Sequence, residues 1–202
     1  MRRSFFVWCI RSLAGAHARW LDRCAYDRQC IYFANHTSNL DAAVLWASLP
    51  PELRDKTRPV AARDYWEASR LRRYLAEQVF HAVLIERKKV TVHTNPIPLM
   101  IEAMGDRYSL IIFPEGGRGQ GEEVGEFKSG LFHLAKGKPE AALIPVFIEN
   151  LNRILPKGEI LPVPLMSTIT FGPPLKVEES ESKAAFLERA RRAVCELNPN
   201  GH

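Results

Sequence analysis

The sequence predicts an α/β fold, in which helices flank a layered sheet whose strands are mixed or largely parallel. Short, almost wholly apolar runs recur along the chain, which is typical of strands that are buried on both faces. Segments with helical periodicity lie between these runs. Two of the runs end directly in charged or glycine-rich residues, at Glu86 and at Glu115, as strands of α/β sheets do where ligand sites collect.

The composition is that of a globular protein. The 202 residues, 46% hydrophobic and 25% charged, fit a single domain over residues 1–202 with a sizeable core. The net charge of +5 indicates an anionic partner, which is a nucleic acid, an anionic membrane or an acidic substrate. The cysteines are scattered without a Cys-x-x-Cys pair, so we expect free thiols in a reducing compartment and no metal site.

The N-terminal stretch is expected to form a basic amphipathic helix over residues 1–22. Its apolar run ends at Arg11, so it is too short to cross a bilayer and is poorly built as a signal peptide. At about 100° per residue its large apolar side chains share one face, and Arg11 and Arg19 lie off that face. Such a helix either lies in a membrane interface or packs on the core of its own domain. The predicted apolar face consists of Phe5, Phe6, Cys9, Ile10, Leu13, Ala16, Trp20 and Leu21.

A histidine and an aspartate lie between the next two predicted elements, a buried strand at residues 31–34 and a helix at residues 42–49. The connecting residues are Asn35-His36-Thr37-Ser38-Asn39-Leu40-Asp41. If Ser38 caps the helix, Asp41 lies in its first turn and reaches back to His36. A histidine titrates near neutral pH and a carboxylate can hold its tautomer, so the pair suits general-base catalysis. Ser38-x-x-Asp41 is also typical of a capping box, in which Asp41 satisfies backbone amides instead.

The residues that follow alternate between predicted strands and helices. The helix at residues 66–79 carries Arg70, Arg72 and Arg73, which either meet phospholipid headgroups or an acidic acyl carrier, or form a solvated face. In order, the elements are a strand at 58–62, a helix at 66–79, a strand at 82–85, a helix at 97–104 and a strand at 108–113.

A glycine-rich loop follows the strand at residues 108–113. It reads Pro114-Glu115-Gly116-Gly117-Arg118-Gly119, and it is not a P-loop because no Gly-Lys-Ser/Thr follows. Glycines let the backbone approach a ligand, and the guanidinium of Arg118 can bind a phosphate through two hydrogen bonds. We expect Glu115 to bind a substrate hydroxyl or to hold Arg118 in place. The alternative is a flexible turn with an exposed arginine.

The C-terminal part contains two more predicted strands. Pro145 lies within the first of them, which favours an edge strand or a bulge there. The elements are a helix from residue 130 to about residue 135, a strand at 141–148, an irregular excursion at 151–164, a strand at 166–171 and a helix at 180–197, with a frayed tail at 198–202.

The motifs taken together resemble those of a known family. After residues 35–41 come Ile85-Glu86-Arg87, Phe113-Pro114-Glu115-Gly116-Gly117-Arg118, Phe127-Lys128-Ser129-Gly130 and Ile144-Pro145-Val146. This order resembles the glycerolipid acyltransferases of the 1-acylglycerol-3-phosphate acyltransferase family. The resemblance implies the glycerolipid acyltransferase fold, and it implies that His36 and Asp41 are catalytic and that Arg87, Glu115, Gly116 and Arg118 bind substrate. The chain departs from the family at Gly117, where threonine is usual, and at Gly119, where serine is common, which affects the acceptor pocket.

The resemblance also implies the reaction. A fatty acyl chain would pass from an acyl thioester of coenzyme A or acyl carrier protein to a hydroxyl of a lysophospholipid, most directly 1-acylglycerol-3-phosphate, giving phosphatidic acid. The expected partners are the acceptor, the acyl-CoA or acyl carrier protein donor and an anionic membrane surface, with no cofactor and no nucleic acid. The expected location is peripheral, on the cytoplasmic face of the membrane. The alternatives are transfer to another lysolipid such as a lyso-ornithine lipid, a thioester or ester hydrolase using the same pair, and a non-enzymatic basic membrane-binding module.

Overall fold

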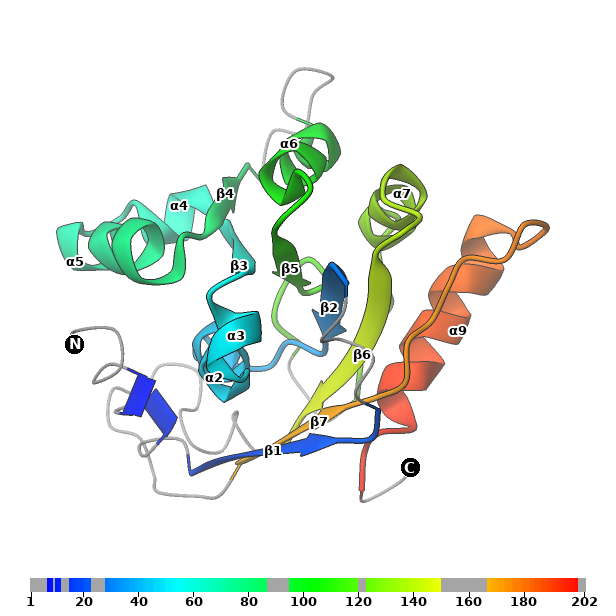
Figure 1. Ribbon diagram of the computed structural model, residues 1–202, viewed down its shortest axis with the longest axis horizontal. Coiled ribbons are helices and arrows are strands. Elements are labelled where there is room, and N and C mark those ends of the chain that lie inside the picture. Colours follow the sequence, from blue (N-terminus) through cyan, green and yellow to red (C-terminus); the bar gives the residue numbers. More distant parts are fainter. Residues whose placement is uncertain are drawn as a thin grey trace.

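The fold is built on a mostly parallel sheet of seven strands in the order β1-β7-β6-β2-β5-β3-β4 (Figure 1). The computed structural model describes residues 7–8, 10–11, 15–22, 28–86, 95–119, 123–149 and 167–199. The β6–β7 pair is antiparallel and the other pairs of this sheet are parallel, which confirms the predicted α/β class. The strands are β1 (Ala16–Trp20), β2 (Cys30–Ala34), β3 (Thr57–Ala62), β4 (Val83–Ile85), β5 (Ser109–Ile112), β6 (Ala142–Ile148) and β7 (Ser167–Phe171).

Helices cover both faces of the sheet. In the central strand β2, Tyr32 packs into one apolar cluster and Ile31 and Phe33 pack into another, on opposite faces. Burial on both faces explains why this strand is a continuous apolar run in the sequence. The first cluster includes residues of α2 (Asp41–Ser48) and of the π-helix η2 (Leu75–Phe80), and the second includes residues of α6 (Pro96–Met104), α7 (Gly130–Gly137) and α9 (Lys183–Cys195).

The predicted N-terminal helix is wrong over its second half. Residues 16–20 form strand β1, which pairs in parallel with β7 (Figure 1). Burial alternates along β1, and the ring of Trp20 stacks on Phe171 with 3.9 Å between ring centroids. The side chains of residues 16–20 therefore alternate with a period of two, where the helical period of 3.6 was expected. Pairing with β7 imposes the strand, and β7 lies far along the chain.

In the first half of that stretch, the structure describes residues 7–8 and 10–11, and these are helical. Val7 is 7% exposed and belongs to the core, although it is not on the predicted apolar face, whereas Trp8 is 64% exposed. Ile10 packs against the same core cluster as Val7. The described part of this helix therefore packs on the core, and Phe5, Phe6, Cys9 and Leu13 of the predicted face lie outside the described residues.

The helix predicted at residues 66–79 is broken into shorter pieces. The short helix α3 (Pro51–Arg54) precedes β3, and α4 (Arg63–Trp66) follows it. The chain restarts as α5 (Arg70–Tyr74), where Ser69 caps the helix by accepting a hydrogen bond from the Arg72 N–H at 3.2 Å. Helix η2 follows α5 and ends at its C-cap residue His81, whose φ of 48° lies in the left-handed region.

Of the two alternatives expected at Pro145, an edge strand or a bulge, the edge strand is wrong. β6 lies between β7 and β2, inside the sheet. Its ladder with β7 begins only at Val146, so the missing N–H of Pro145 falls at the margin of that ladder. The Pro145 carbonyl still accepts a hydrogen bond from the Gly172 N–H at 2.9 Å.

Some of the remaining expectations concern described residues, and others fall outside them. Cys30 and Cys195 are free thiols, and Cys9 and Cys24 lie outside the described residues, as do the predicted excursion at 151–164 and residues 200–202. Within the described ranges, no helix is both long and apolar enough to cross a membrane. The carboxyl ends of β2, β5, β3 and β4 meet at one edge of the sheet because these strands are parallel, and this edge positions the site.

Candidate active site

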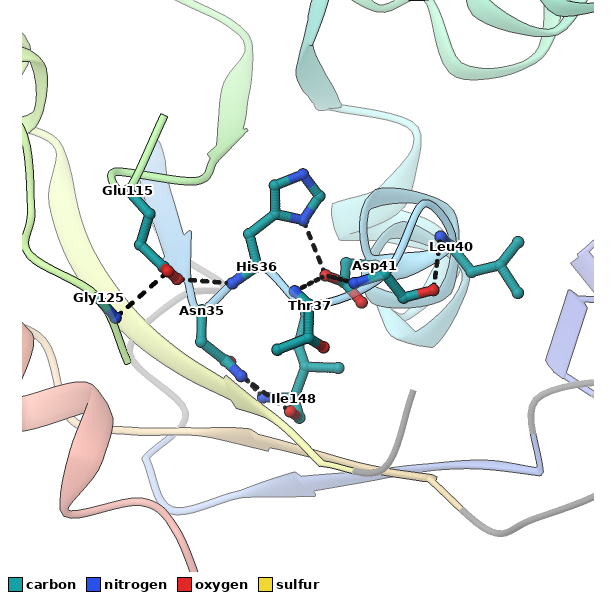
Figure 2. Close-up of polar contacts among 9 residues, drawn as sticks. Asn35, His36, Thr37, Leu40, Asp41, Glu115, Gly125 and Ile148 are labelled. Atoms are coloured by element: carbon teal, nitrogen blue, oxygen red, sulfur yellow. Dashed lines mark hydrogen bonds and ion pairs between the residues drawn. The ribbon is translucent and has the colours of Figure 1, made fainter. Parts of the chain in front are cut away.

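His36 and Asp41 lie together at the carboxyl end of β2, as the sequence predicts. The Nδ1 atom of His36 lies 2.8 Å from Asp41 Oδ2 (Figure 2). The same oxygen accepts hydrogen bonds from the backbone N–H groups of Thr37 at 2.6 Å and Ser38 at 2.8 Å. Asp41 is fully buried, so three donors converge on one oxygen of a carboxylate that water does not reach. Asp41 therefore accepts hydrogen bonds from backbone amides, as the capping interpretation expects. It also contacts the histidine, as the catalytic interpretation expects.

The local turn differs from the expected cap. α2 begins at Asp41, with Leu40 as its N-cap residue and no side-chain capping bond. The hydroxyl of Ser38 instead accepts a hydrogen bond from the Leu40 N–H at 3.3 Å. The carboxylate of Asp41 serves the amides that precede the helix rather than those within it.

The geometry determines which nitrogen of His36 is basic. An ionised carboxylate only accepts hydrogen bonds, so Nδ1 carries the proton that it shares with Asp41, and Nε2 carries the lone pair. Nε2 points away from Asp41 in Figure 2. The ring stacks on Phe113, with 4.3 Å between centroids, and its side chain is 20% exposed. His36 thus presents a basic nitrogen, held in orientation from two sides.

Glu115 makes two backbone contacts that the sequence did not predict. Its Oε1 accepts a hydrogen bond from the His36 backbone N–H at 2.7 Å, and its Oε2 accepts one from the Gly125 N–H at 3.2 Å (Figure 2). No ion pair joins it to Arg118, and both residues lie within the described ranges. The glycine-rich loop also holds His36 through the Gly119 N–H, which donates to the His36 carbonyl at 2.8 Å. Glu115 therefore anchors the backbone that carries His36.

Burial raises the pKa of the Glu115 carboxyl from its ordinary value of 4.5, and the hydrogen bonds from His36 and Gly125 partly offset this. The folded protein therefore binds this proton more readily than the unfolded chain does. The contribution of Glu115 to the free energy of unfolding should fall as pH rises from 4.5 through the folded pKa, and stay constant above it.

Glu115→Gln removes this titration, so we expect the stability difference between wild type and variant to fall as pH rises through that window. Urea unfolding of both proteins at pH values from about 4 to 8 measures it. Glu77→Gln, at an exposed position on η2, is the matched control. A difference that stays level or grows with pH would contradict the raised pKa.

Asn35 is a positioning residue whose role the sequence does not predict, although it belongs to the motif at residues 35–41. Its buried side-chain amide donates to the Ile148 carbonyl at 3.0 Å and accepts from the Ile148 N–H at 2.8 Å (Figure 2). Ladder pairing between β2 and β6 reaches Ala34 and Val146, so the Asn35 side chain continues it beyond the end of β2. This bridge holds the residue next to His36. No signal in the sequence shows a bridge to a residue so far along the chain.

Asn35→Ala should lower the free energy of unfolding by about 1–3 kcal/mol for each of the two Ile148 backbone groups that it leaves buried and unpaired. It should also reduce turnover, because His36 is the next residue. Urea unfolding and steady-state kinetics check both effects. The control is Gln78→Ala on the exposed side of η2, which should stay within about 0.5 kcal/mol of wild type. A folded Asn35→Ala variant of wild-type stability would contradict the bridging role.

A cavity of about 240 Å³ opens beside His36 at this edge of the sheet. The polar side chains that line it are those of His36, Asn39, Arg118 and Lys128. Apolar residues from β3, β4, β5, α6 and α7 make up most of the remaining wall, including Val60, Ile85, Met100, Ile112 and Leu131. The cavity therefore combines the histidine and two cationic side chains with a mostly apolar wall.

The structure brings together most of the residues that the sequence predicts. Gly116, Arg118 and His36 line the same cavity, whereas Arg87 lies outside the described residues, which resume at Asn95 after Glu86. A side chain at Gly117 would meet nothing within 4 Å. The departure from the usual threonine there therefore leaves open space beside the site.

Fold and site together define an α/β protein with a histidine–aspartate pair at the carboxyl edge of a mostly parallel sheet. Residues 16–149 match the family model described as Acyltransferase, and the chain belongs to this family. The resemblance inferred from the motifs is thereby confirmed.

Two known proteins show how far the similarity extends. The chain is 23% identical over 157 residues to the 1-acyl-sn-glycerol-3-phosphate acyltransferase of Limnanthes douglasii, an overlap of 75% of this chain and 52% of the plant protein. The chain thus spans about half the length of that relative. The crystal structure of the 1-acyl-sn-glycerophosphate (LPA) acyltransferase PlsC from Thermotoga maritima superimposes with a TM-score of 0.71 at 19% identity, covering 98% of this chain and 81% of the other. At this identity, the likeness shows a common fold.

Proposed function

We propose that this protein moves a fatty acyl chain from an acyl thioester to a hydroxyl of a lysophospholipid, with 1-acylglycerol-3-phosphate as acceptor and phosphatidic acid as product. One observation carries the proposal: His36, held by Asp41 at 2.8 Å, lines a cavity that combines two cationic side chains with mostly apolar walls. A phosphate headgroup suits the cations and an acyl chain suits the apolar walls. The plant and Thermotoga proteins are both named as acyltransferases of this acceptor, which supports the proposal.

The proposed mechanism is direct transfer without a covalent enzyme intermediate. Nε2 of His36 removes the proton of the acceptor hydroxyl as its oxygen attacks the thioester carbonyl. Asp41 stabilises the imidazolium that forms. The carbon–sulfur bond then breaks, and the thiolate leaves with the proton from His36, so that a free thiol and a new ester are the products.

The tetrahedral oxyanion needs a hydrogen-bond donor, and the turn after His36 offers few. The Thr37 and Ser38 amides donate to Asp41, and the Leu40 and Asp41 amides donate to Ser38. Among these residues Asn39 has an amide with no hydrogen bond inside the described structure, and it lines the cavity beside His36. The Asn39 amide is therefore the donor that this turn offers to the oxyanion.

We expect the cationic and the apolar residues of the cavity to bind different parts of the substrate. Arg118 is exposed and lines the cavity, where its guanidinium can bind two phosphate oxygens, and Arg87 is its expected companion. Each methylene of an acyl chain buried against the apolar walls contributes about 0.8 kcal/mol. Binding energy from the headgroup and from the acyl chain thus positions the hydroxyl at His36.

A lipid acceptor brings the protein to a membrane surface, and its net charge of +5 favours an anionic one. Trp8, Leu71 and Tyr74 are exposed apolar side chains, and the cations Arg70 and Arg73 accompany the last two on α5. Peripheral binding on the cytoplasmic face follows from this proposal. The full chain should sediment with vesicles of an anionic phospholipid and remain in the supernatant with neutral vesicles, and equal sedimentation with both would contradict it.

A thioester-release assay tests the function. Release of free thiol from acyl-CoA should depend on added lysophosphatidic acid, and mass spectrometry should find phosphatidic acid as the product. Release without acceptor would instead identify a hydrolase, and no release with either acyl-CoA or an acylated carrier protein would favour a non-enzymatic membrane-binding module. A parallel screen with other lysolipids, including a lyso-ornithine lipid, identifies the acceptor.

A further inference from the structure

The end of the Lys128 side chain occupies the place where a side chain at Gly116 would lie. A Cβ atom built at Gly116 would be 2.7 Å from Lys128 Nζ and 2.8 Å from its Cδ, so the flexible end of the lysine side chain would have to move away. Gly116 also has a φ of 70°, a conformation that side chains disfavour. The backbone N–H of Lys128 donates to the Pro114 carbonyl at 2.9 Å, which ties the two segments together. The glycine-rich loop thus leaves a hollow that holds this ammonium group.

Lys128 and Arg118 line the same cavity without an ion-pair partner in the part of the chain that the structure describes. Both side chains are exposed, and no carboxylate of the described residues lies within ion-pair distance of either. A lysine that serves the fold through an ion pair has a partner, as Lys138 has in Glu140 at 3.6 Å. Lys128 instead lines the cavity together with the histidine base.

We propose that Lys128 is a second cation for the phosphate of the acceptor, and that Gly116 is glycine because the lysine side chain needs its space. This rests on the proposed function and adds a specificity-determining residue to it. A phosphate monoester carries close to two negative charges near pH 7, so a planar guanidinium from Arg118 and a point charge from Lys128 complement it. Lys128 thereby favours a phosphate headgroup over an uncharged one.

The phosphates of coenzyme A have the same chemistry, so the experiment separates the two sources. Lys128→Met removes the charge and keeps the stem, and Lys128→Arg restores a charge. Lys136→Met is the matched control, because Lys136 is exposed on α7 and does not line the cavity. Kinetics are measured with lysophosphatidic acid as acceptor, and with either acyl-CoA or an acyl-N-acetylcysteamine thioester, which lacks phosphate, as donor. Inhibition by glycerol 3-phosphate is measured as a second readout.

We expect Lys128→Met to raise the KM for lysophosphatidic acid and the inhibition constant of glycerol 3-phosphate by at least about 10-fold each, with either donor. Lys128→Arg should recover most of the loss, and Lys136→Met should match wild type. An unchanged KM for the acceptor, an equal loss in the control, or a loss seen only with acyl-CoA would overturn the assignment of Lys128. In each of those cases wild-type transfer to lysophosphatidic acid would still stand, whereas its absence would overturn the proposed function and this inference together.

Gly116→Ala tests the positioning half of the inference. It should reproduce the KM effect of Lys128→Met by displacing the lysine, and the double variant should lose little more than either single one. Additive losses in proteins with wild-type melting curves would contradict the shared role. If Gly116→Ala does not fold, the Lys128 series decides the proposal by itself.

Discussion

His36→Ala should abolish acyl transfer, with a loss in kcat of at least about 10²–10⁴-fold, the range expected when a general base is removed. Nε2 is the basic atom in our proposed mechanism, and no other described histidine lines the cavity. The variant should still fold, because Asp41 keeps the backbone amides of Thr37 and Ser38 as donors. Thiol release with lysophosphatidic acid, paired with a melting curve, measures both properties.

His133→Ala is the matched control, since His133 is exposed on α7 and does not line the cavity. It should turn over like wild type. A folded His36→Ala variant with near wild-type turnover would remove His36 as the base, whatever its distance from Asp41.

Asp41→Asn should reduce kcat by on the order of 10²–10⁴-fold and affect the KM for the acceptor much less. The amide oxygen can take the place of Oδ2, but it carries no charge to stabilise the imidazolium. The amide nitrogen then takes the place of Oδ1, which is buried without a hydrogen-bond partner among the described residues, so some stability should be lost as well.

Asp41→Ala separates the two roles of this carboxylate. It leaves two backbone amides and the His36 ring without their acceptor, and each buried amide left unpaired costs about 1–3 kcal/mol. We therefore expect a much larger loss of stability than in Asp41→Asn, with a comparable loss of turnover. Asp106→Asn, at an exposed carboxylate, serves as the control. If Asp41→Asn lowers the melting temperature and leaves kcat unchanged, Asp41 is a structural acceptor only.

Much of the fold and part of the site could be predicted because their causes are local. His36 and Asp41 are five positions apart, so one strand-to-helix turn brings them to 2.8 Å. The apolar runs that become β2, β5 and β6 are buried on both faces, and this leaves a pattern in the sequence itself. Gly116 and Arg118 follow β5 directly, so a parallel sheet delivers them to the edge where β2 delivers His36.

Other features depended on partners that are distant in the sequence. Residues 16–20 fit a helical face and an alternating strand almost equally, because Ala16 and Trp20 share a side in both, and only pairing with β7 decides between them. The helix predicted at 66–79 is interrupted before residue 70, because the Ser69 hydroxyl caps the N-terminus of a separate helix, α5.

The features of the site also divide into those with local causes and those that depend on distant residues. The sequence by itself determined the fold class, the histidine–aspartate pair and the loop that carries Arg118, because neighbouring residues and local periodicity specify them. Only the tertiary structure decided that Glu115 holds the His36 backbone, that Asn35 bridges to Ile148, and that Lys128 fills the hollow at Gly116. Each of these contacts joins segments that the folded sheet brings together, and a hydrogen bond or a close packing contact between distant residues leaves no periodic pattern in the chain.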